Sequence, residues 1–414
     1  MRLIYHLGIR VYGLGIRIAA LSNPKAKSWI TGRKGLYQKL EKTTGAADKP
    51  IWFHCASLGE FEQGRPLIER IKGERPERKI LLSFFSPSGY EAQKEYPLAD
   101  CVCYLPLDTR KNMRRFVKCT HPALLILVKY EFWANLLRVL HERKIPVYCI
   151  SARFRKDQVW FKPLGSYIRR ALKLITHFFV QDEQSVQCLQ KWGIKNVLLT
   201  GDTRYDRVIA IKAQGNRLGF LEEFKQDEHL FIAGSSWRTD ERALLSLIDR
   251  NPVGVKYLIA PHHIDESHIE FLVKRLHSKR AIRYTQVRPG ADLSNARVLI
   301  LDTVGLLSQS YAYGDIAYVG GGFGKKGIHN ILEPAAFGNA VFFGPNYAKF
   351  TEARQMLRAD AGLSVSDAER FLAQAQSLIS NAEKRNAYGT RAARFVKSHA
   401  GATDKIYRFL KDVL

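Results

Sequence analysis

The chain has 414 residues, enough for two domains that each bury a hydrophobic core. With 46% hydrophobic and 25% charged residues, its composition is that of a folded globular protein and excludes an intrinsically disordered chain. Its 65 Lys and Arg against 39 Asp and Glu give a formal net charge of +26, which favours an anionic partner: nucleic acid, a phospholipid surface or a phosphorylated substrate.

Residues 1–22 predict an amphipathic helix with basic and apolar stripes side by side. Arg2, Arg10 and Arg17 fall on the basic stripe, and three arginines are too many for a helix that spans a membrane. We expect this helix to lie in a membrane surface, and residues 1–40 to form a membrane-associated helix with a basic flank. A helix packed on the protein's own core is the alternative.

An alternation of short strands and helices follows, as in a doubly wound parallel sheet. It predicts a first Rossmann-like domain over residues 41–204. The predicted strands are 51–54, 79–84, 101–105, 123–128, 146–150, 177–180 and a last one near 198.

A second series predicts another Rossmann-like domain over residues 205–381, opened by a basic helical stretch at 205–225. Residues 382–414 are predicted to be helical and to return across the hinge, so that the two domains face one cleft. The predicted strands of this series are 230–233, 255–260, 282–284, 298–301, 316–319 and 341–343.

Two acidic residues follow strand ends in the first domain. Glu60 comes just after the segment Ser57-Leu-Gly59, where a helix is expected to start, and Glu131 comes just after another strand. A carboxylate at a helix N-terminus stays ionised and can serve as a general base, although it can equally well only complement the helix dipole. Because loops from one sheet edge converge, the two carboxylates are expected to lie close together.

Small and polar residues follow the strands of the second domain. Ser235 and Ser236 could hold a phosphate, and Asp302 could cap a helix or contact a ribose. His262 and His263 are adjacent, but neighbouring side chains diverge and no H-E-x-x-H spacing occurs, so we predict no metal site.

A glycine-rich loop follows the strand at 316–319. Its glycines, among them Gly321 and Gly322, together with Lys325 and a helix expected over residues 328–336, have the layout of a phosphate site. The match to G-x-G-x-x-G is weak evidence for a dinucleotide, since no acidic residue ends the following strand, and the P-loop pattern fails. We predict no cofactor. None of the six cysteines forms a C-x-x-C pair, which favours reduced thiols in a cytosolic protein.

Several segments of the sequence form an ordered set of motifs. The segments are His54-Cys-Ala-Ser-Leu-Gly-Glu60, Glu131-Phe-Trp-Ala-Asn135, Gly234-Ser-Ser, Ala260-Pro-His-His, Asp302-Thr, Val319-Gly-Gly, His329-Asn-Ile-Leu-Glu333-Pro-Ala-Ala and Phe343-Gly-Pro345. In this order they resemble one family, the 3-deoxy-D-manno-octulosonic acid (Kdo) transferases of lipopolysaccharide synthesis. The similarity spans nearly the whole chain, and the order and spacing of the segments are more specific than any one of them.

The resemblance implies a B-type glycosyltransferase fold and inverting, metal-independent transfer from CMP-Kdo to a lipid A precursor at the cytoplasmic face of the inner membrane. It implies that Glu60 is the general base, that Glu131 assists it, and that Ser57 and Gly59 belong to the acceptor site. The implied CMP-Kdo site comprises Ser235, Ser236, His262, His263, Asp302, Gly321, Gly322, Lys325, His329, Asn330 and Glu333.

Two positions depart from the family pattern. The family usually has Arg-His where this chain has His262-His263, and glycine where it has Ile328. Lys325, Lys326 or Arg238 is a candidate for the missing positive charge. Another B-type glycosyltransferase or a nucleotide-sugar epimerase would fit the same fold. A nucleic-acid binding protein would explain the charge, but the basic residues are spread along the chain without a recognisable module, so we expect no nucleic-acid partner.

Overall fold

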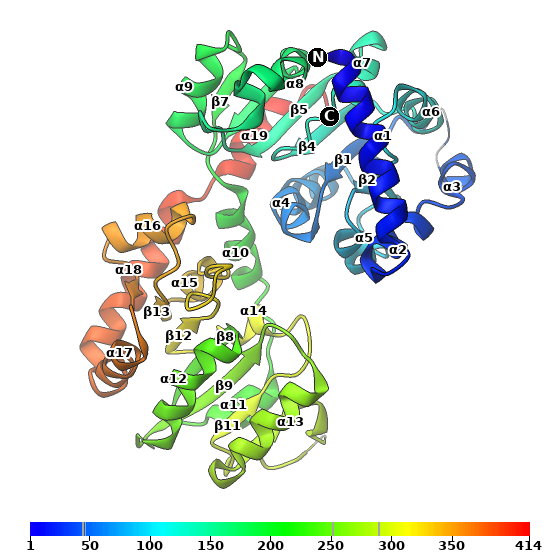
Figure 1. Cartoon of the computed structure of the whole chain (residues 1–414). Helices are drawn as coiled ribbons and strands as arrows, with labels where there is room; N and C mark the ends of the chain where they lie inside the picture. Colours follow the sequence, from blue (N-terminus) through cyan, green and yellow to red (C-terminus); the bar gives the residue numbers. More distant parts are fainter. Residues whose placement is uncertain (44, 46, 251, 289) are drawn as a thin grey trace. The chain divides into compact units, whose positions relative to one another are not determined.

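The computed structural model describes residues 1–43, 45, 47–250, 252–288 and 290–414. Two compact units make up the chain: unit 1 is Met1–Arg207 with Ala400–Leu414, and unit 2 is Val208–His399. Each unit is built on a seven-stranded sheet whose paired strands are parallel (Figure 1). The predicted α/β class with two Rossmann-like sheets is therefore confirmed.

The sheet of unit 1 has the strand order β3-β2-β1-β4-β5-β6-β7. Its central strands are apolar runs buried at every position, which requires helices on both faces of the sheet. The strands are β1 Ile51–Cys55, β2 Ile80–Phe84, β3 Cys101–Tyr104, β4 Leu124–Val128, β5 Val147–Ala152, β6 His177–Val180 and β7 Val197–Leu199.

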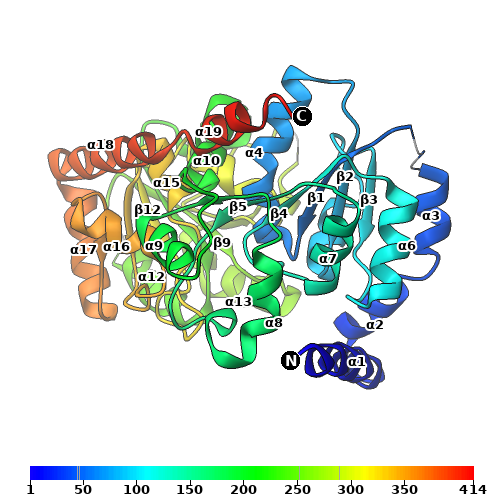
Figure 2. The same ribbon diagram turned by 90° about the horizontal axis from the view of Figure 1, so that it is seen from above.

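Helices lie beside the strands of this sheet (Figure 2), and two hydrophobic clusters of side chains cover its two faces. One contains apolar residues of α3, α6 and α7, and the other contains those of α4 and of the C-terminal α19. The helices are α1 Arg2–Ala19, α2 Pro24–Thr31, α3 Leu36–Thr43, α4 Leu58–Glu74, α5 Pro87–Gln93, α6 Arg110–Thr120, α7 Ala134–Glu142, α8 Ser166–Leu172, α9 Glu183–Lys191, α10 Thr203–Ala213, at whose middle unit 1 ends, and α19 Ala402–Leu410.

The sheet of unit 2 has the strand order β10-β11-β9-β8-β12-β13-β14. Helices α12, α13 and α17 pack on one of its faces and α11 on the other. The strands are β8 His229–Ser236, β9 Val255–Pro261, β10 Ala281–Arg283, β11 Val298–Ile300, β12 Ile316–Val319, β13 Ala340–Phe343 and β14 Leu363–Ser364. The helices are α11 Gly219–Lys225, α12 Arg238–Asp249, α13 Glu266–Arg275, α14 Leu307–Ser310, α15 Leu332–Phe337, α16 Thr351–Arg358, α17 Ala368–Ser380 and α18 Ala382–His399.

Each sheet has one point where the direction of chain winding reverses. In unit 1 this switch point lies between β1 and β4, and in unit 2 it lies between β8 and β12. Loops that leave the carboxyl ends of such strands diverge and leave a crevice, which is where open α/β sheets bind ligands. Most of the predicted site residues lie at the ends of these four strands or of their neighbour β9.

Three predicted helical stretches differ from the structure. The stretch 205–225 is broken between α10 and α11, where Gly215 has a positive φ of 59°. The helix predicted over 328–336 starts only at Leu332, so the glycine loop does not lead directly into a helix N-terminus. The stretch 382–414 is interrupted at Gly401, whose φ of 105° favours glycine, and α18 belongs to unit 2 while α19 belongs to unit 1.

Helix α1 contacts its own unit along one face only. Tyr5 donates a hydrogen bond of 2.6 Å to Asp108, accepts one from the backbone of Ala134 at 3.1 Å, and is followed on the same face by the buried Ile9. The opposite face is exposed and includes the predicted apolar stripe, with Leu3 83% exposed, and Arg2, Arg10 and Arg17 are exposed as well. Among the described residues, we find no helix with both the length and the apolar character needed to cross a bilayer.

Candidate active site

Glu60 lies in the first turn of α4, directly after β1. Its carboxylate accepts a hydrogen bond from the backbone N–H of Ala56, which fixes the side chain beside the strand end. Ser57 occupies the N-cap position without bonding the first-turn amides through its hydroxyl. A side chain at the exposed Gly59 would meet no atom within 4 Å, so the glycine leaves open space next to Glu60.

Glu131 follows β4, the strand that pairs with β1, and so lies at the same sheet edge. One of its carboxylate oxygens accepts a hydrogen bond of 2.8 Å from the Trp133 indole and lies 3.3 Å from Nε2 of His54. The other nitrogen of His54, Nδ1, is 2.8 Å from the Ser83 hydroxyl. The buried pair Ser83 and His54 therefore holds the Glu131 carboxylate in place through hydrogen bonds.

The pKa of Glu60 is raised to about 7 by its surroundings. Burial is the largest cause, the negative charge of Glu131 acts in the same direction, and the hydrogen bond from the Ala56 N–H opposes the shift. The sequence predicted that the helix N-terminus keeps Glu60 ionised. The structure corrects this, because desolvation outweighs the helix terminus and makes Glu60 a group that exchanges its proton near neutral pH.

In unit 2, four aromatic rings gather at the carboxyl ends of β8, β9 and β12. Trp237 stacks on His262 with ring centroids 4.8 Å apart, and His263 meets Trp237 edge-on at 4.9 Å. The Trp237 indole donates a hydrogen bond of 2.8 Å to Nε2 of His329, whose ring lies 4.2 Å from that of His262. We call Trp237, His262, His263 and His329 the ring cluster.

Two histidines of the ring cluster, His262 and His329, have lowered pKa values and so favour the neutral ring. Burial lowers the pKa of His329 to about 4, helped by His262, His263 and Lys326, and burial also lowers the pKa of His262. Because Nε2 of His329 accepts the indole hydrogen bond, the proton of its neutral ring lies on Nδ1. Lys326, with its Nζ 4.7 Å from the Trp237 ring centroid, is the cation at this cluster.

Ser235 and Ser236 end β8 in a bulge against β9. Ser235 has a positive φ of 52°, a strained conformation for a serine, and is partly exposed. Ser236 is buried, and its hydroxyl donates a hydrogen bond of 2.9 Å to Glu241. The other carboxylate oxygen of Glu241 lies 2.7 Å from Nε2 of His268. The Ser236 hydroxyl is thus engaged inside the unit, so of the two predicted serines Ser235 is the one placed to meet a ligand.

Close packing explains the glycines at positions 321 and 322. The Gly321 amide donates 2.8 Å to Asp240, so it is not available to a phosphate. A side chain at Gly322 would come within 2.6 Å of the Gly344 backbone. The predicted phosphate cradle is therefore corrected at Gly321, while Lys325, exposed on the same loop, stays a predicted donor contact.

The remaining predicted donor residues are held by their own neighbours. Asn330 donates a hydrogen bond of 2.9 Å to Glu333, which also accepts one of 3.0 Å from the Ser308 hydroxyl. Asn330 and Glu333 therefore form a polar pair at the start of α15. Asp302 is buried and accepts hydrogen bonds from Arg283 and from the backbone and hydroxyl of Thr285. Its predicted contact with a ribose stays a prediction.

Three further residues organise these sites, and none of them was predicted to have a role. His54 supports Glu131, and Trp237, just after the two serines, bonds His329. Asp240 holds the loops of unit 2 together, because it accepts hydrogen bonds from the Tyr318 hydroxyl at 2.6 Å and from the Trp237 backbone at 2.9 Å. Only the position of Asp240 three residues after Trp237, as in a capping box, could have indicated it.

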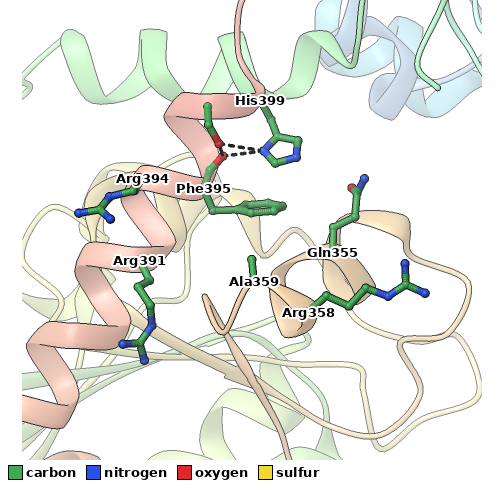
Figure 3. Close-up of a pocket in the computed structure, with 8 residues that line it drawn as sticks. Gln355, Arg358, Ala359, Arg391, Arg394, Phe395 and His399 are labelled. Atoms are coloured by element: carbon green, nitrogen blue, oxygen red, sulfur yellow. Dashed lines mark hydrogen bonds between the residues drawn. The ribbon is translucent and has the colours of Figure 1, made fainter. Parts of the chain in front are cut away.

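A cavity of about 570 Å³ lies elsewhere in unit 2, between α16 and α18 (Figure 3). Phe395 points into it above Ala359, and Arg358, Arg391 and Arg394 surround it. Arg391 is held by Asp360, 3.1 Å away. The residues of this cavity are not among the predicted site residues.

Comparisons with known proteins bear on both units. Residues 29–207 match the family model described as 3-deoxy-D-manno-octulosonic-acid transferase (kdotransferase). The chain is 28% identical over 375 residues to a 3-deoxy-D-manno-octulosonic acid transferase of Chlamydia pneumoniae, covering 88% of this chain and 85% of that protein. It is 27% identical over 419 residues to the protein of the same name from Haemophilus influenzae, covering 96% and 94%.

Solved structures share the fold at low sequence identity. A putative UDP-N-acetylglucosamine 2-epimerase from Listeria monocytogenes aligns with a TM-score of 0.61 and 12% identity, over 88% of this chain and 96% of that one. The UDP-GlcNAc 2-epimerase from Neisseria meningitidis aligns with a TM-score of 0.61 and 13% identity, over 88% and 100%. At this identity the likeness concerns the fold alone.

The resemblance seen in the sequence segments is confirmed. The chain is similar to 3-deoxy-D-manno-octulosonic acid transferases over nearly its whole length, and its residues 29–207 are the part that matches the model of that glycosyltransferase family.

Proposed function

We propose that the protein is an inverting glycosyltransferase that moves Kdo from CMP-Kdo to a hydroxyl of the lipid A precursor, lipid IVA, in lipopolysaccharide synthesis. The observation that carries this proposal is the pair Glu60 and Glu131 at the switch point of unit 1, in the part of the chain that matches the Kdo transferase model. The names of the curated relatives support the same activity.

Glu60 has the properties of a general base for a sugar hydroxyl. Its pKa of about 7 gives it both an ionised fraction and a strong affinity for a proton near neutral pH. When Glu60 takes the hydroxyl proton, the acceptor oxygen can attack the anomeric carbon of the donor as the bond to CMP breaks. Glu131, held by Trp133 and His54, is proposed to bind the acceptor next to the base.

The ring cluster of unit 2 suits the other half of the reaction. CMP leaves as an anion, and a leaving anion needs hydrogen-bond donors or cations, but no protein acid. Because the pKa values of His262 and His329 are lowered, we assign the positive charge to Lys326 and hydrogen bonding to the neutral rings. The partly exposed Ser235 and the Asn330–Glu333 pair are proposed to complete the CMP-Kdo site.

A mass assay tests the transferase. The protein is incubated with CMP-Kdo and tetra-acylated lipid A precursor, and we expect a product heavier by one or more Kdo groups. UDP-GlcNAc, the substrate in the name of one solved neighbour, is the comparison substrate and should be neither epimerised nor hydrolysed. Epimerisation without Kdo transfer would reject the proposal in favour of an epimerase of the same fold.

We also propose that α1 places the protein at the cytoplasmic face of the inner membrane. Supporting this, Leu3 and Leu7 are 83% and 63% exposed on a helix that also carries three arginines, and Leu21, just after the end of that helix, is 88% exposed. Water-exposed apolar side chains gain about 25 cal/mol for each Å² that enters an apolar phase. Arginines on the same helix would meet anionic headgroups.

Substitution of exposed leucines tests the membrane proposal without disturbing the packed face of α1. Leu3→Ser with Leu7→Ser and Leu21→Ser should release the protein from sedimenting vesicles. Tyr5 and Ile9, which pack α1 against its own unit, are kept. The matched control is Val253→Ser with Val304→Ser, at two positions of unit 2 that are 91% and 88% exposed. Equal vesicle binding by the triple variant and the control would exclude α1 as the anchor.

A further inference from the structure

A cavity of about 670 Å³ lies between α1 and the start of α6 in unit 1. Two kinds of side chain line it: the cations Arg2, Arg10, Arg110 and Lys111, and apolar residues of α1 that include Leu3 and Leu7. We call it the α1–α6 cavity. Neither Glu60, Glu131 nor any residue of the ring cluster lines it.

Three of its four cations have no partner among the residues that the structure describes. Arg2, Arg10 and Lys111 are exposed and form no side-chain hydrogen bond or ion pair with residues that the structure describes. Arg110 alone is paired, at 2.6 Å to Glu142. An unpaired cluster of like charges is costly to hold together, which favours an anion from outside the protein.

The acidic residue of the cavity does not neutralise these cations by direct pairing. Asp108 is fully buried, and both of its oxygens accept hydrogen bonds, from Tyr5 and the backbone amides of Asn135 and Leu136. The other titratable group is His6, whose pKa is lowered by burial and then by Arg2, Arg10, Arg110 and Arg138. The four arginines thus act on His6 in the direction expected of a positive potential, in addition to the larger effect of burial.

We infer that the α1–α6 cavity binds the phosphate of an anionic lipid headgroup. Arginine and lysine side chains donate charge-assisted hydrogen bonds that suit phosphate oxygens. The exposed leucines beside them identify the source as a lipid, because a free phosphate has no apolar part to cover them. This inference rests on the proposed membrane association and gives it a defined headgroup site in place of diffuse attraction between α1 and the surface.

A headgroup site predicts a preference among lipids of similar charge. A phosphomonoester, as in phosphatidic acid, exposes three phosphate oxygens to the cavity, whereas phosphatidylserine presents a phosphodiester and a carboxylate. At matched surface potential, we expect the protein to bind vesicles with phosphatidic acid about tenfold more tightly than vesicles with phosphatidylserine. Attraction by net charge alone predicts equal binding.

Vesicle flotation of the full chain tests this inference with two charge-matched double variants. Arg10→Ala with Lys111→Ala removes two cations from the cavity and should abolish the preference for phosphatidic acid. Lys94→Ala with Lys118→Ala removes two exposed cations of unit 1 outside the cavity and should retain it. Arg2→Gln with Lys111→Gln is a second cavity variant, used if the first one folds poorly by circular dichroism.

The outcomes separate this inference from the two proposals before it. Equal binding of wild type to both lipids, or a preference kept by both cavity variants, would overturn the headgroup site while leaving membrane association intact. No binding to either vesicle would reject both the headgroup site and the membrane association. None of these outcomes bears on Kdo transfer.

A competition experiment tests whether the bound anion is a lipid. Inorganic phosphate, with chloride as the ionic-strength control, should not displace the protein from vesicles with phosphatidic acid. Full displacement by millimolar phosphate would mean a free-anion site and would also overturn the inference.

Discussion

At the switch point of the first sheet lie the carboxylates Glu60 and Glu131, and at the switch point of the second lie three histidines, a tryptophan and Lys326. The two sheets share strand number, parallel pairing and the position of the crevice. They differ in the loops that leave the strand ends. The same architecture therefore provides an acidic site in one unit and an aromatic and cationic site in the other.

Burial is the largest cause of a pKa shift at each of the two sites, and the two shifts have opposite directions. It raises the pKa of the Glu60 carboxyl to about 7 and lowers the pKa of the His329 imidazole to about 4. In both cases the uncharged form is favoured. The result is a carboxylate that can take a proton at neutral pH, and an imidazole that has already lost one. We expect proton transfer to belong to unit 1 and anion binding to unit 2.

The largest expected effect comes from Glu60→Ala. Removal of a general base typically costs a factor of 10² to 10⁴, so we expect turnover to fall about 1,000-fold. Glu74→Ala, at the exposed end of the same helix, is the matched control and should retain activity. A Glu60→Ala variant with wild-type kcat would contradict the assignment of the base.

Lys326→Ala is expected to act on the donor instead. Loss of a charge-assisted contact to phosphate costs about 1.5–3 kcal/mol, so KM for CMP-Kdo should rise by about tenfold or more. Lys325→Ala tests the neighbouring lysine and should have the smaller effect, and the exposed Lys349→Ala should have none. Unchanged donor KM in both loop variants would remove the two lysines from the site.

The pH dependence should differ between the two half-sites. Because Glu60 must be deprotonated to act, and its pKa is about 7, activity should increase by about tenfold between pH 6 and pH 8. CMP affinity, followed by calorimetry, should not change because of His329 over this range, since the pKa of His329 is about 4. A turnover profile that is flat from pH 6 to 8 would show that no group of the Glu60 type limits the reaction.

The smallest expected effect is on stability. Folding raises the pKa of Glu60, so its ionised form destabilises the fold above pH 7, whereas below pH 4.5 the side chain is protonated in both states. Glu60→Gln should therefore increase the free energy of unfolding at pH 8 by about 1 kcal/mol and should give no increase at pH 4. The value at pH 8 is smaller than the free energy that corresponds to the full pKa shift, because the side chain is partly exposed to solvent. Denaturant titration at the two pH values measures this, and an equal change at both would point to packing.

Most strands could be predicted from the sequence because apolar runs and the loops after them are local signals, whereas the strand order, and with it each switch point, was not predicted. The strand at 177–180 has the predicted bounds, and β1 differs by one residue. The break between α10 and α11 was missed because a basic helical pattern continues through it. The role of Asp240 and the support of Glu131 by His54 depend on contacts between residues 77 or more positions apart, which periodicity cannot show.

The pKa of Glu60 belongs to the same class of property. A helix N-terminus is visible in the sequence and favours an ionised carboxylate, but the burial that outweighs it arises only when β1, α4 and the segment after β4 pack together. The closed packing of Gly321 and Gly322 was hidden for a similar reason, because a phosphate loop and a tightly packed loop both require glycine.

The central claim is that unit 1 transfers the proton and unit 2 binds the anion. Its most direct test measures kcat and the donor KM of Glu60→Ala and Lys326→Ala in the same CMP-Kdo assay. We predict that Glu60→Ala lowers kcat and leaves the donor KM within about twofold of wild type, and that Lys326→Ala raises the donor KM and leaves kcat nearly unchanged. If both variants change the same parameter, base and anion site are not divided between the two units.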